Sequence, residues 1–288
     1  MAPHPILGAA SRRLGPRGPR VVGVVNVTPD SFSDGGRYLD PQVAIAHGVA
    51  LVEEGADWLD VGGESTRPGA QAPGVQEEQD RVLPVLEGLA RAVPDVVCSV
   101  DTRRGAVARA ALAAGAGVVN DVSGGRDPDL LAAGAEAGAV VVLGHLRGTP
   151  DTMQADTRFG DLTAEVLGEL LASVAAAERA GVPRHHLVAD PGLGFGKAPR
   201  DNPRLFGLVP RLQAEGLAVM IGASRKRFVG ELTGQADPAL RVHGSLGAAV
   251  AAMVRGADFL RVHDVRATID ALRVARACLD GELADVAE

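Results

Sequence analysis

Side chains that could take part in chemistry recur at the carboxyl-terminal ends of short apolar runs along this chain. In order of position they are Asn26, the segment 64–67 (ESTR), Asp101, Asn120, Asp121, His145, Asp190, the segment 224–226 (SRK), Arg261, His263 and Asp264. Any one of them could be structural, since an Asp in this position also caps the helix that follows it. A structural role alone explains poorly why carboxylates and cations both occur at the ends of successive apolar runs.

The set divides into two kinds of chemistry. One kind offers donors and acceptors that suit a flat, nitrogen-rich heterocycle, and its members are Asp101, Asn120, Asp190 and Lys226. A carboxylate can accept both N–H groups at the edge of an amidine-like ring. The other kind offers cationic donors that suit phosphate oxygens, and its members are Arg67, Arg261 and His263. A site with both kinds predicts a heteroaromatic substrate that carries a phosphate or pyrophosphate.

Two rare residue types support this interpretation. The chain has 29 basic Lys and Arg residues, but only Lys197 and Lys226 are lysines. Arg cannot replace Lys where a tight site needs a compact ammonium, so a retained lysine indicates a specific role. Asn occurs only at positions 26, 120 and 202, and two of these end apolar runs. The alternative is chance combined with the preference of Asn for turns.

Eight apolar runs with strand character must position these side chains. They span 21–28, 57–63, 96–101, 117–122, 139–145, 186–192, 218–224 and 259–264. Several are almost continuous in Val, Leu and Ile, which is typical of strands buried on both faces. Stretches with helical spacing lie between them, at 41–55, 75–92, 103–115, 129–138, 162–181, 203–216, 238–256 and 266–279, and the pattern at 129–138 is the weakest.

Eight strand-then-helix units favour the α/β class, and within it a single-domain (β/α)8 TIM barrel over an open sheet. A doubly wound sheet would require a Gly-rich phosphate fingerprint after an early strand, and none is present. The segment 192–197 (GLGFGK) also fails the phosphate-loop pattern, because Pro191 stands where the first Gly is needed and Ala198 replaces the Ser or Thr that binds magnesium. In a TIM barrel the active site lies at the carboxyl-terminal ends of the strands, where the polar side chains would converge.

Length and composition fit this architecture. The chain has 288 residues, and we place the barrel at 21–280, between a flexible N-terminal tail (1–20) and a C-terminal tail (281–288). Aromatic residues make up only 3% of the chain, so the core must consist of Val, Leu, Ala and Ile. The net charge of −7 argues against a nucleic-acid binder, and it requires local cations to hold an anionic substrate.

The same composition predicts a cytoplasmic location. Residues 1–20 lack the apolar run of a signal peptide, and the chain has no stretch of 18 uncharged apolar residues that could span a membrane. Its two cysteines, Cys98 and Cys278, have neither metal-ligand spacing nor the pattern of a disulfide framework.

Seven motifs of this chain resemble, in the same order, those of the dihydropteroate synthases, a family of pterin-binding enzymes. The two longest, at 25–36 (VNVTPDSFSDGG) and 60–69 (DVGGESTRPG), are highly specific. The others are 99–102 (SVDT), 120–124 (NDVSG), 190–197 (DPGLGFGK), 222–226 (GASRK) and 261–264 (RVHD). The resemblance extends from residue 21 to about residue 280.

The resemblance implies a transferase of folate biosynthesis. Its reaction joins 6-hydroxymethyl-7,8-dihydropterin diphosphate to p-aminobenzoate, and it yields 7,8-dihydropteroate and pyrophosphate. It implies only small-molecule partners, a homodimer, Mg²⁺ as cofactor and inhibition by sulfonamides. Neither nucleic acid nor a membrane is an expected partner.

The resemblance also implies roles for individual residues. The dihydropterin ring would be held by Asp101, Asn120, Asp190 and Lys226, of which Asp101, Asp190 and Lys226 are the catalytic candidates. The pyrophosphate would be held by Arg67, Arg261 and His263, with its Mg²⁺ on Asn26. The substrate-binding set also includes Thr66, Phe195 and Gly222. The loops and the aminobenzoate pocket would be shaped by Phe32, Ser33, Asp34 and Pro68.

One position departs from the family pattern. The family usually has Met-His at the end of the fifth strand, with the Met packed against the pterin, whereas this chain has Gly144-His145. We expect the pterin packing on that side to be looser, or to be completed by a neighbour such as Leu146.

The chemistry implied by the resemblance favours a dissociative path. A C–O bond breaks at a CH2 group next to an electron-rich ring, and magnesium and the cations neutralise the charge that grows on the pyrophosphate. The ring delocalises the developing positive charge, which Asp101 or Asp190 would stabilise, and the arylamine then adds. No covalent nucleophile is needed.

Two other functions are alternatives. A pterin-dependent methyltransferase of the same fold would share the pterin-holding Asp and Asn residues, but it has no need of the pyrophosphate-binding motifs 66–68 (TRP) and 261–263 (RVH). A non-catalytic pterin-binding protein would be expected to lose Asn26, Lys226 or the loop motifs, and all of these are present.

Overall fold

A computed structural model, which describes residues 4–28, 40–65 and 72–281, shows eight parallel strands that close into a barrel in chain order. The strands are β1 (Arg20–Asn26), β2 (Trp58–Gly62), β3 (Val97–Asp101), β4 (Val118–Asp121), β5 (Val140–Gly144), β6 (Leu187–Asp190), β7 (Ala218–Ile221) and β8 (Phe259–Val262). The barrel closes where β8 pairs with β1, from Arg20↔Phe259 to Gly23↔Val262. The predicted (β/α)8 barrel is therefore confirmed.

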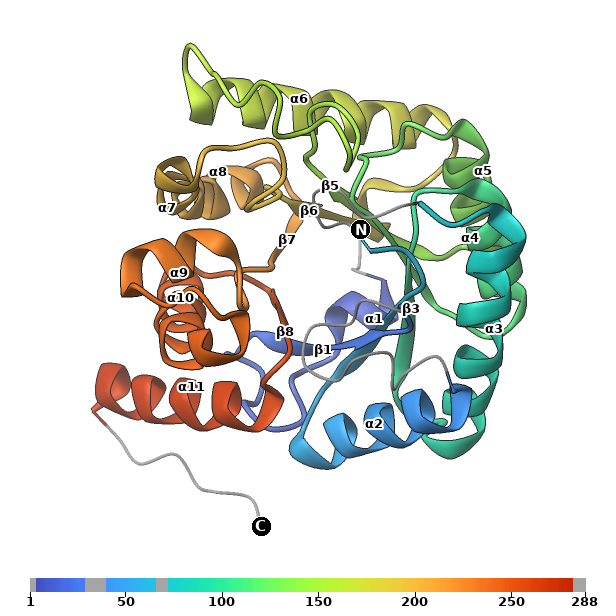
Figure 1. Cartoon of the computed structure of the whole chain (residues 1–288), viewed down its shortest axis with the longest axis horizontal. Coiled ribbons are helices and arrows are strands. Elements are labelled where there is room, and N and C mark those ends of the chain that lie inside the picture. The colour runs from blue at the N-terminus through green and yellow to red at the C-terminus, as the bar shows by residue number, and fades with distance from the viewer. Residues whose placement is uncertain (1–3, 29–39, 66–71, 282–288) are drawn as a thin grey trace.

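Helices surround the ring of strands (Figure 1). They are α2 (Pro41–Glu54), α3 (Val75–Ala92), α4 (Gly105–Ala113), α5 (Pro128–Ala137), α6 (Leu162–Arg179), α7 (Asn202–Leu205), α8 (Val209–Ala214), α9 (Arg227–Thr233), α10 (Val242–Val254) and α11 (Val265–Asp280). The sequence explains where several of them begin and end. The Asp40 side chain caps α2, whose first residue is a proline, and Gly55 ends this helix with a φ of 112°.

The inward-facing side chains of the barrel form an apolar lower part and a polar upper part. Side chains alternate between the two faces of a strand, so residues two positions apart point the same way in successive layers. The lower apolar cluster contains Val22, Trp58, Val118, Val140, Val142, Val188, Met220 and Phe259. Two positions further along the same strands stand Asp60, Asn120, Asp190 and Arg261. The register of the strands thus brings the polar residues to one end of the barrel.

The chain before β1 packs against the opposite, N-terminal end of the barrel. It includes the short helix α1 (Pro5–Gly8), whose Leu7 joins the lower apolar cluster. The Asp57 carboxylate, just before β2, accepts hydrogen bonds from Ser11 Oγ at 2.9 Å, the Arg12 N–H at 2.6 Å and the Val21 N–H at 2.8 Å. These bonds hold the segment before β1 against the base of the barrel.

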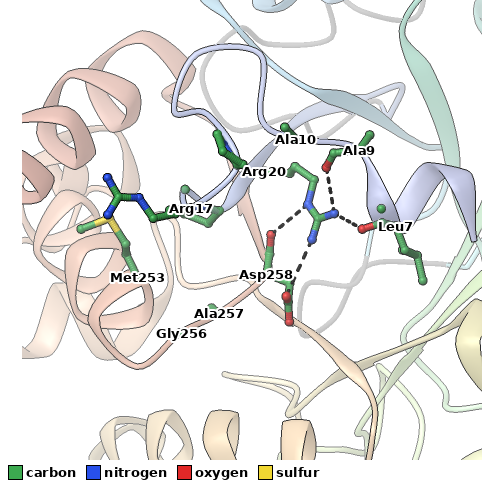
Figure 2. Close-up of a pocket in the computed structure, with 13 residues that line it drawn as sticks. Leu7, Ala9, Ala10, Arg17, Arg20, Met253, Gly256, Ala257 and Asp258 are labelled. Atoms are coloured by element: carbon green, nitrogen blue, oxygen red, sulfur yellow. Dashed lines mark hydrogen bonds and ion pairs between the residues drawn. The ribbon is translucent and has the colours of Figure 1, made fainter. Parts of the chain in front are cut away.

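A small cavity of about 290 Å³ lies at this end of the barrel (Figure 2). The Arg20 guanidinium donates to the carbonyls of Leu7 and Ala9 and lies 3.7 Å from Asp258. Of the charged residues that line the cavity, Arg20 is paired with Asp258, and Arg17 lies 3.7 Å from Asp280 on α11. The cavity lies at the opposite end of the barrel from the polar side chains.

The observed elements follow the predicted ones closely, with two added short helices, α1 and α9, and with the predicted helix 203–216 divided into α7 and α8. All eight predicted strands are present, and most end one or two residues before the predicted boundary. Helix α9, which has 7 residues, was not among the predicted helices, because one and a half to two turns give no readable 3.6-residue periodicity. Among the described residues, none of the helices is both long and apolar enough to cross a membrane.

Candidate active site

A cavity of about 310 Å³ opens at the carboxyl-terminal ends of the strands. Six predicted site residues line it: Asn26, Asp101, Phe195, Lys226, Arg261 and His263. They come from β1, β3, the loop after β6, the loop after β7, and β8 with the residue that follows it. The barrel therefore brings together side chains that are up to 237 positions apart in the sequence (263 minus 26).

The centre of the site is a cluster around Arg261, in which Asp60 and Asn120 are buried and the Arg261 and Asp101 side chains are 21% and 20% exposed. The Arg261 Nε donates to Asp60 Oδ2 at 2.6 Å, and its Nη2 donates to Asp101 Oδ2 at 2.8 Å. The Asn120 Nδ2 donates to the same Asp60 oxygen at 2.9 Å. Asp60 is only 1% exposed, and its other oxygen, Oδ1, has no hydrogen-bond partner. One guanidinium thus donates to two carboxylates, while its Nη1 has no hydrogen-bond partner among the described residues.

This sharing determines the charge state of the cluster. Burial, opposed by Arg261 and reinforced by the neighbouring Asp60 carboxylate, raises the pKa of Asp101 to about 7. The pKa of Arg261 is raised above its ordinary value by Asp60 and Asp101, which outweigh the opposing effect of burial. The guanidinium is therefore permanently charged, and Asp101 titrates near neutral pH.

Asp190 and Lys226 form the second part of the site. The Gly192 N–H donates to Asp190 Oδ1 at 2.7 Å, and the Lys226 ammonium donates to the Leu193 carbonyl. The same ammonium lies 4.3 Å from the centroid of the Phe195 ring. Burial raises the pKa of Asp190, and burial lowers the pKa of Lys226 to about 8 against the opposing effect of Asp190.

Gly222 leaves a gap between these side chains. A Cβ atom at this position would lie 3.7 Å from Arg261 Cβ, 3.8 Å from Asp190 Oδ2 and 4.0 Å from Lys226 Nζ. A larger side chain would therefore fill the space that the three polar side chains surround.

His263 and Ser224 stand at the outer side of the site. The His263 Nδ1 lies 3.0 Å from Ser224 Oγ, which also accepts the His263 backbone N–H at 3.2 Å. Burial, together with the charges of Arg261, Arg225 and Lys226, lowers the pKa of His263 to about 3. The imidazole is neutral in the free protein, so His263 differs from the cation expected from the sequence and offers a single N–H donor.

The structure places most of the predicted site residues, but not all of them. Asn120, Asp190 and Gly222 lie on the barrel wall beside the residues that line the cavity, as the contacts above show. The predicted residues Phe32, Ser33, Asp34, Thr66, Arg67 and Pro68 lie outside the described residues.

Asp60 is the main site residue that was not selected from the sequence. It lies within the second apolar run and not at its end, so it lacked the feature used to select the others. A charged residue inside an otherwise apolar strand is itself a signal, because a buried carboxylate must be paired. Asp60 accepts from both Arg261 and Asn120, and it therefore organises two predicted residues.

The position of Gly144 also has a structural reason. A Cβ atom there would lie 2.9 Å from Val122 Cα and 3.1 Å from the Val122 carbonyl oxygen, so the backbones after β4 and at the end of β5 pack too closely for a side chain. Met153, from the loop after β5, lines the cavity. Leu146, which was expected to complete the packing, is buried and is not among the residues that line it.

Together, the fold and the site define the class of protein, a (β/α)8-barrel enzyme with its site at the carboxyl-terminal ends of the strands. The model of the pterin binding enzyme family matches residues 22–263. The dihydropteroate synthase of Mycobacterium leprae is 49% identical over 271 residues, which cover 90% of this chain and 93% of that protein.

Solved structures agree with this match. A dihydropteroate synthase from Xanthomonas albilineans with 4-aminobenzoic acid has a TM-score of 0.84 and 50% identity, and the match covers 91% of this chain and 94% of that one. The same enzyme in complex with 7,8-dihydropteroate has a TM-score of 0.81 and 47% identity, with 91% and 94% covered. This chain belongs to the pterin-binding enzyme family, among its dihydropteroate synthases.

Proposed function

We propose that the protein condenses 6-hydroxymethyl-7,8-dihydropterin diphosphate with p-aminobenzoate to give 7,8-dihydropteroate and pyrophosphate. The observation that carries this proposal is the pairing, at one cavity, of the Asp60 and Asp101 carboxylates with a permanently charged guanidinium whose Nη1 has no hydrogen-bond partner among the described residues. The carboxylates suit the N–H groups of a pterin, and the guanidinium suits a phosphate. The similarity to enzymes solved with aminobenzoate and with dihydropteroate supports the same substrates.

The pterin ring would occupy the gap at Gly222. Asp190 would accept two ring N–H groups along one edge, and Lys226 would donate to a ring acceptor beside it. Asp101 and Asn120 would bond the opposite edge, while Asp60 and Arg261 hold these two side chains in place. Phe195 lies against Lys226 and would cover one side of the bound substrate.

The diphosphate would lie toward Arg261 Nη1 and His263. His263 would meet it as a neutral donor, so the positive charge near it comes from Arg261 together with Arg225 and Lys226. We propose that Arg67 and Thr66 contribute from the loop after β2. Phe32, Ser33, Asp34 and Pro68 would shape the aminobenzoate pocket.

The donor set at Asn26 fits a magnesium ion that is bound mainly by the substrate. The side chain lines the cavity, and its Oδ1 lies 3.8 Å from the position that a Cβ of Gly62 would take. The described residues contain no group of three or more His, Cys, Asp or Glu that could hold a metal by themselves. Mg²⁺ usually keeps several waters and binds through one or two protein oxygens plus substrate phosphates. Bound to Asn26 and the diphosphate, it would neutralise charge on the leaving group.

The residues of the site suit a dissociative reaction. The C–O bond between the pterin methylene and the diphosphate breaks, and its electron pair leaves with the diphosphate, which Arg261 and His263 stabilise. The positive charge left on the pterin is stabilised by the Asp101 and Asp190 carboxylates. The arylamine nitrogen then forms the new C–N bond and loses its proton to water or to the departing diphosphate.

The function has a direct test with three distinguishable results. The purified protein is incubated with both substrates and Mg²⁺, and pyrophosphate and dihydropteroate are measured. Formation of both products in equal amounts supports the proposal. Pterin binding without turnover would support the non-catalytic alternative, and methyl transfer from a methylated pterin to a corrinoid protein would support the methyltransferase.

The assembly and the location are part of the same proposal. We propose that the protein acts as a homodimer in the cytoplasm, on the basis of its resemblance to the family. Light scattering of the purified protein measures the mass in solution, and a monomer mass would contradict the dimer.

We predict that pterin affinity increases as the pH rises through about 7, because Asp101 must be ionised to accept a ring N–H and burial raises its pKa to about 7. The Kd for 6-hydroxymethylpterin is measured by calorimetry at about pH 5.5 and about pH 7.5. This ligand lacks the diphosphate, so titration of phosphate groups does not contribute to the difference. Asp101→Asn is the control, and it should bind weakly at both values. Equal affinity of the unchanged protein at both pH values contradicts the prediction.

We predict that Asn26→Ala weakens the Mg²⁺-dependent binding of pyrophosphate by roughly tenfold or more, because a direct oxygen ligand is lost. Asn26→Asp retains an oxygen and should retain the Mg²⁺ effect. Calorimetry of pyrophosphate with and without Mg²⁺ measures the difference, and circular dichroism verifies the fold. An Asn26→Ala protein with an unchanged Mg²⁺ effect would remove this role from Asn26.

A further inference from the structure

Lys197, the first of the two lysines in the chain, is buried at the end of the loop after β6. Only 1% of this residue is exposed. Its Nζ lies 2.9 Å from the Gly192 carbonyl oxygen, 2.8 Å from the Phe195 carbonyl oxygen, 3.2 Å from the His145 carbonyl oxygen and 2.8 Å from His145 Nδ1. An ammonium has three N–H donors and no acceptor, so these four acceptors use its whole capacity.

The acceptors belong to two segments that must be held together. His145 follows β5, whereas Gly192 and Phe195 belong to the loop after β6. The two backbones are in close contact, because a Cβ atom at Gly192 would lie 2.0 Å from the His145 carbonyl oxygen. Carbonyl dipoles that converge in this way repel one another unless a cation or several donors lie between them. The Lys197 ammonium supplies both.

The other side of the same loop faces the active site. The Gly192 N–H donates to Asp190, the Leu193 carbonyl accepts from Lys226, and the Phe195 ring lies over the Lys226 ammonium. The loop has three glycines with positive φ, at 192, 194 and 196, so its own backbone is easily deformed. Its shape therefore depends on the bonds that hold it, and Lys197 makes several of them.

His145 extends this support to the protein surface. Its Nε2 lies 3.0 Å from Glu169 Oε2 on α6, and Arg147 donates to the same carboxylate at 3.0 Å and 3.2 Å. Burial, with the neighbouring Lys197 charge, lowers the pKa of His145 to about 4, so the ring is neutral. A neutral ring that donates from Nε2 to Glu169 presents its Nδ1 lone pair to Lys197. Glu169 thereby selects the tautomer that Lys197 requires.

We propose that Lys197 is a positioning residue for the reaction, since its buried ammonium fixes the loop after β6 against the end of β5 and so sets Asp190 and Phe195 relative to Lys226. This inference deepens the proposed function and rests on it for the identity of the substrate. Lys197 itself contacts the loop backbone and His145, and it acts on the substrate through the neighbouring groups.

The test compares Lys197→Met with a variant that only destabilises the fold. Methionine has a similar length but no donors. Leu170→Ala, at a buried position on α6 that does not line the cavity, supplies a loss of stability without a change in the loop. For each variant the unfolding temperature, the Kd for 6-hydroxymethylpterin and the hydrogen exchange of the peptide that covers 191–198 are measured. Where product forms, kcat and both KM values are measured as well.

The expected result is a specific loss in Lys197→Met. Its Kd for the pterin should rise between about 10-fold and 100-fold, because a small displacement of positioning groups has effects of this size. Exchange of the 191–198 peptide should accelerate, whereas Leu170→Ala should lower the unfolding temperature and leave both quantities unchanged. A Lys197→Met protein that loses stability like Leu170→Ala but retains wild-type pterin affinity and exchange would overturn the proposal.

A second pair of variants keeps the test available if Lys197→Met does not fold. His145→Leu removes one of the four acceptors, and His145→Asn retains a side-chain acceptor in that region. His145→Leu should show a smaller increase in Kd in the same direction, and His145→Asn should recover part of it. Equal affinities for both variants and the unchanged protein would also overturn the proposal. Because pterin binding and exchange need no turnover, failure of the wild-type protein to form dihydropteroate would count against the proposed function alone.

Discussion

Replacing Lys226 with arginine should lower kcat/KM for the dihydropterin diphosphate by roughly 100-fold or more. A hydrogen bond to a charged group contributes about 1.5–3 kcal/mol, and an oversized side chain in a packed site costs about 1–3 kcal/mol more. The Lys226 ammonium has little free space, because it donates to the Leu193 carbonyl and lies 4.3 Å from the Phe195 centroid. A longer, planar guanidinium at this position would extend into the space beside Gly222 that the pterin ring would occupy.

Steady-state kinetics with both substrates measures this effect. Arg109→Lys is the control, because it also exchanges Arg and Lys but at an exposed ion pair with Glu136 on the outer helices. It should leave both kcat and KM unchanged. Circular dichroism and the unfolding temperature show whether Lys226→Arg is folded. A folded Lys226→Arg protein with near-normal kcat/KM contradicts the requirement for a compact ammonium.

Replacing Arg261 with methionine should both destabilise the barrel and abolish tight substrate binding. The substitution leaves the buried Asp60 and the Asp101 side chain, which is 20% exposed, without a counter-charge. Breaking a buried ion pair in this way costs about 3–5 kcal/mol. The free energy of unfolding, from urea titration, should fall by about this amount at about pH 8. It should fall less at about pH 5, because burial raises the pKa of Asp101 to about 7 and its protonation removes part of the unpaired charge.

The sign of this pH effect separates charge from packing. In the unchanged protein the pKa of Asp101 is already raised to about 7, so the folded state holds a proton that the unfolded state releases at lower pH. The contribution of Asp101 to the free energy of unfolding therefore decreases as the pH rises toward 7. This decrease becomes larger when Arg261 is absent. Asp60→Asn combined with Arg261→Met should recover part of the stability. An equal loss at both pH values would assign the effect to lost packing.

The positions of the site residues on the strands could be predicted from the sequence because the period of a strand is two. Polar side chains at the ends of apolar runs must lie at one end of a parallel barrel, and Asn26, Asp101, Arg261 and His263 do so. Asp60 could not be selected by that rule, since its importance depends on Arg261, a partner 201 positions away in the sequence. Pairing across the barrel is a property of the closed ring and is absent from any local pattern.

Charge states were equally outside the reach of local patterns. His263 was interpreted as a cation from its residue type, yet burial lowers its pKa to about 3, together with the charges of Arg261, Arg225 and Lys226 from two different strand ends. The departure at position 144 could be detected in the sequence, but its cause is the contact between the Gly144 and Val122 backbones. In each case the deciding neighbour is brought close only by folding.

The ion pairs between β8 and the early strands have a consequence for synthesis on the ribosome. Asp60 and Asp101 are made first, but Arg261 emerges about 160 to 200 residues later, as the separations of 160 and 201 positions require. Until then neither carboxylate can enter the interior without a large desolvation cost. A nascent chain that ends before β8 should therefore keep β2 and β3 open to solvent, remain sensitive to protease and bind chaperones. Arrested chains of increasing length should become protease-resistant abruptly, once Arg261 has left the exit tunnel.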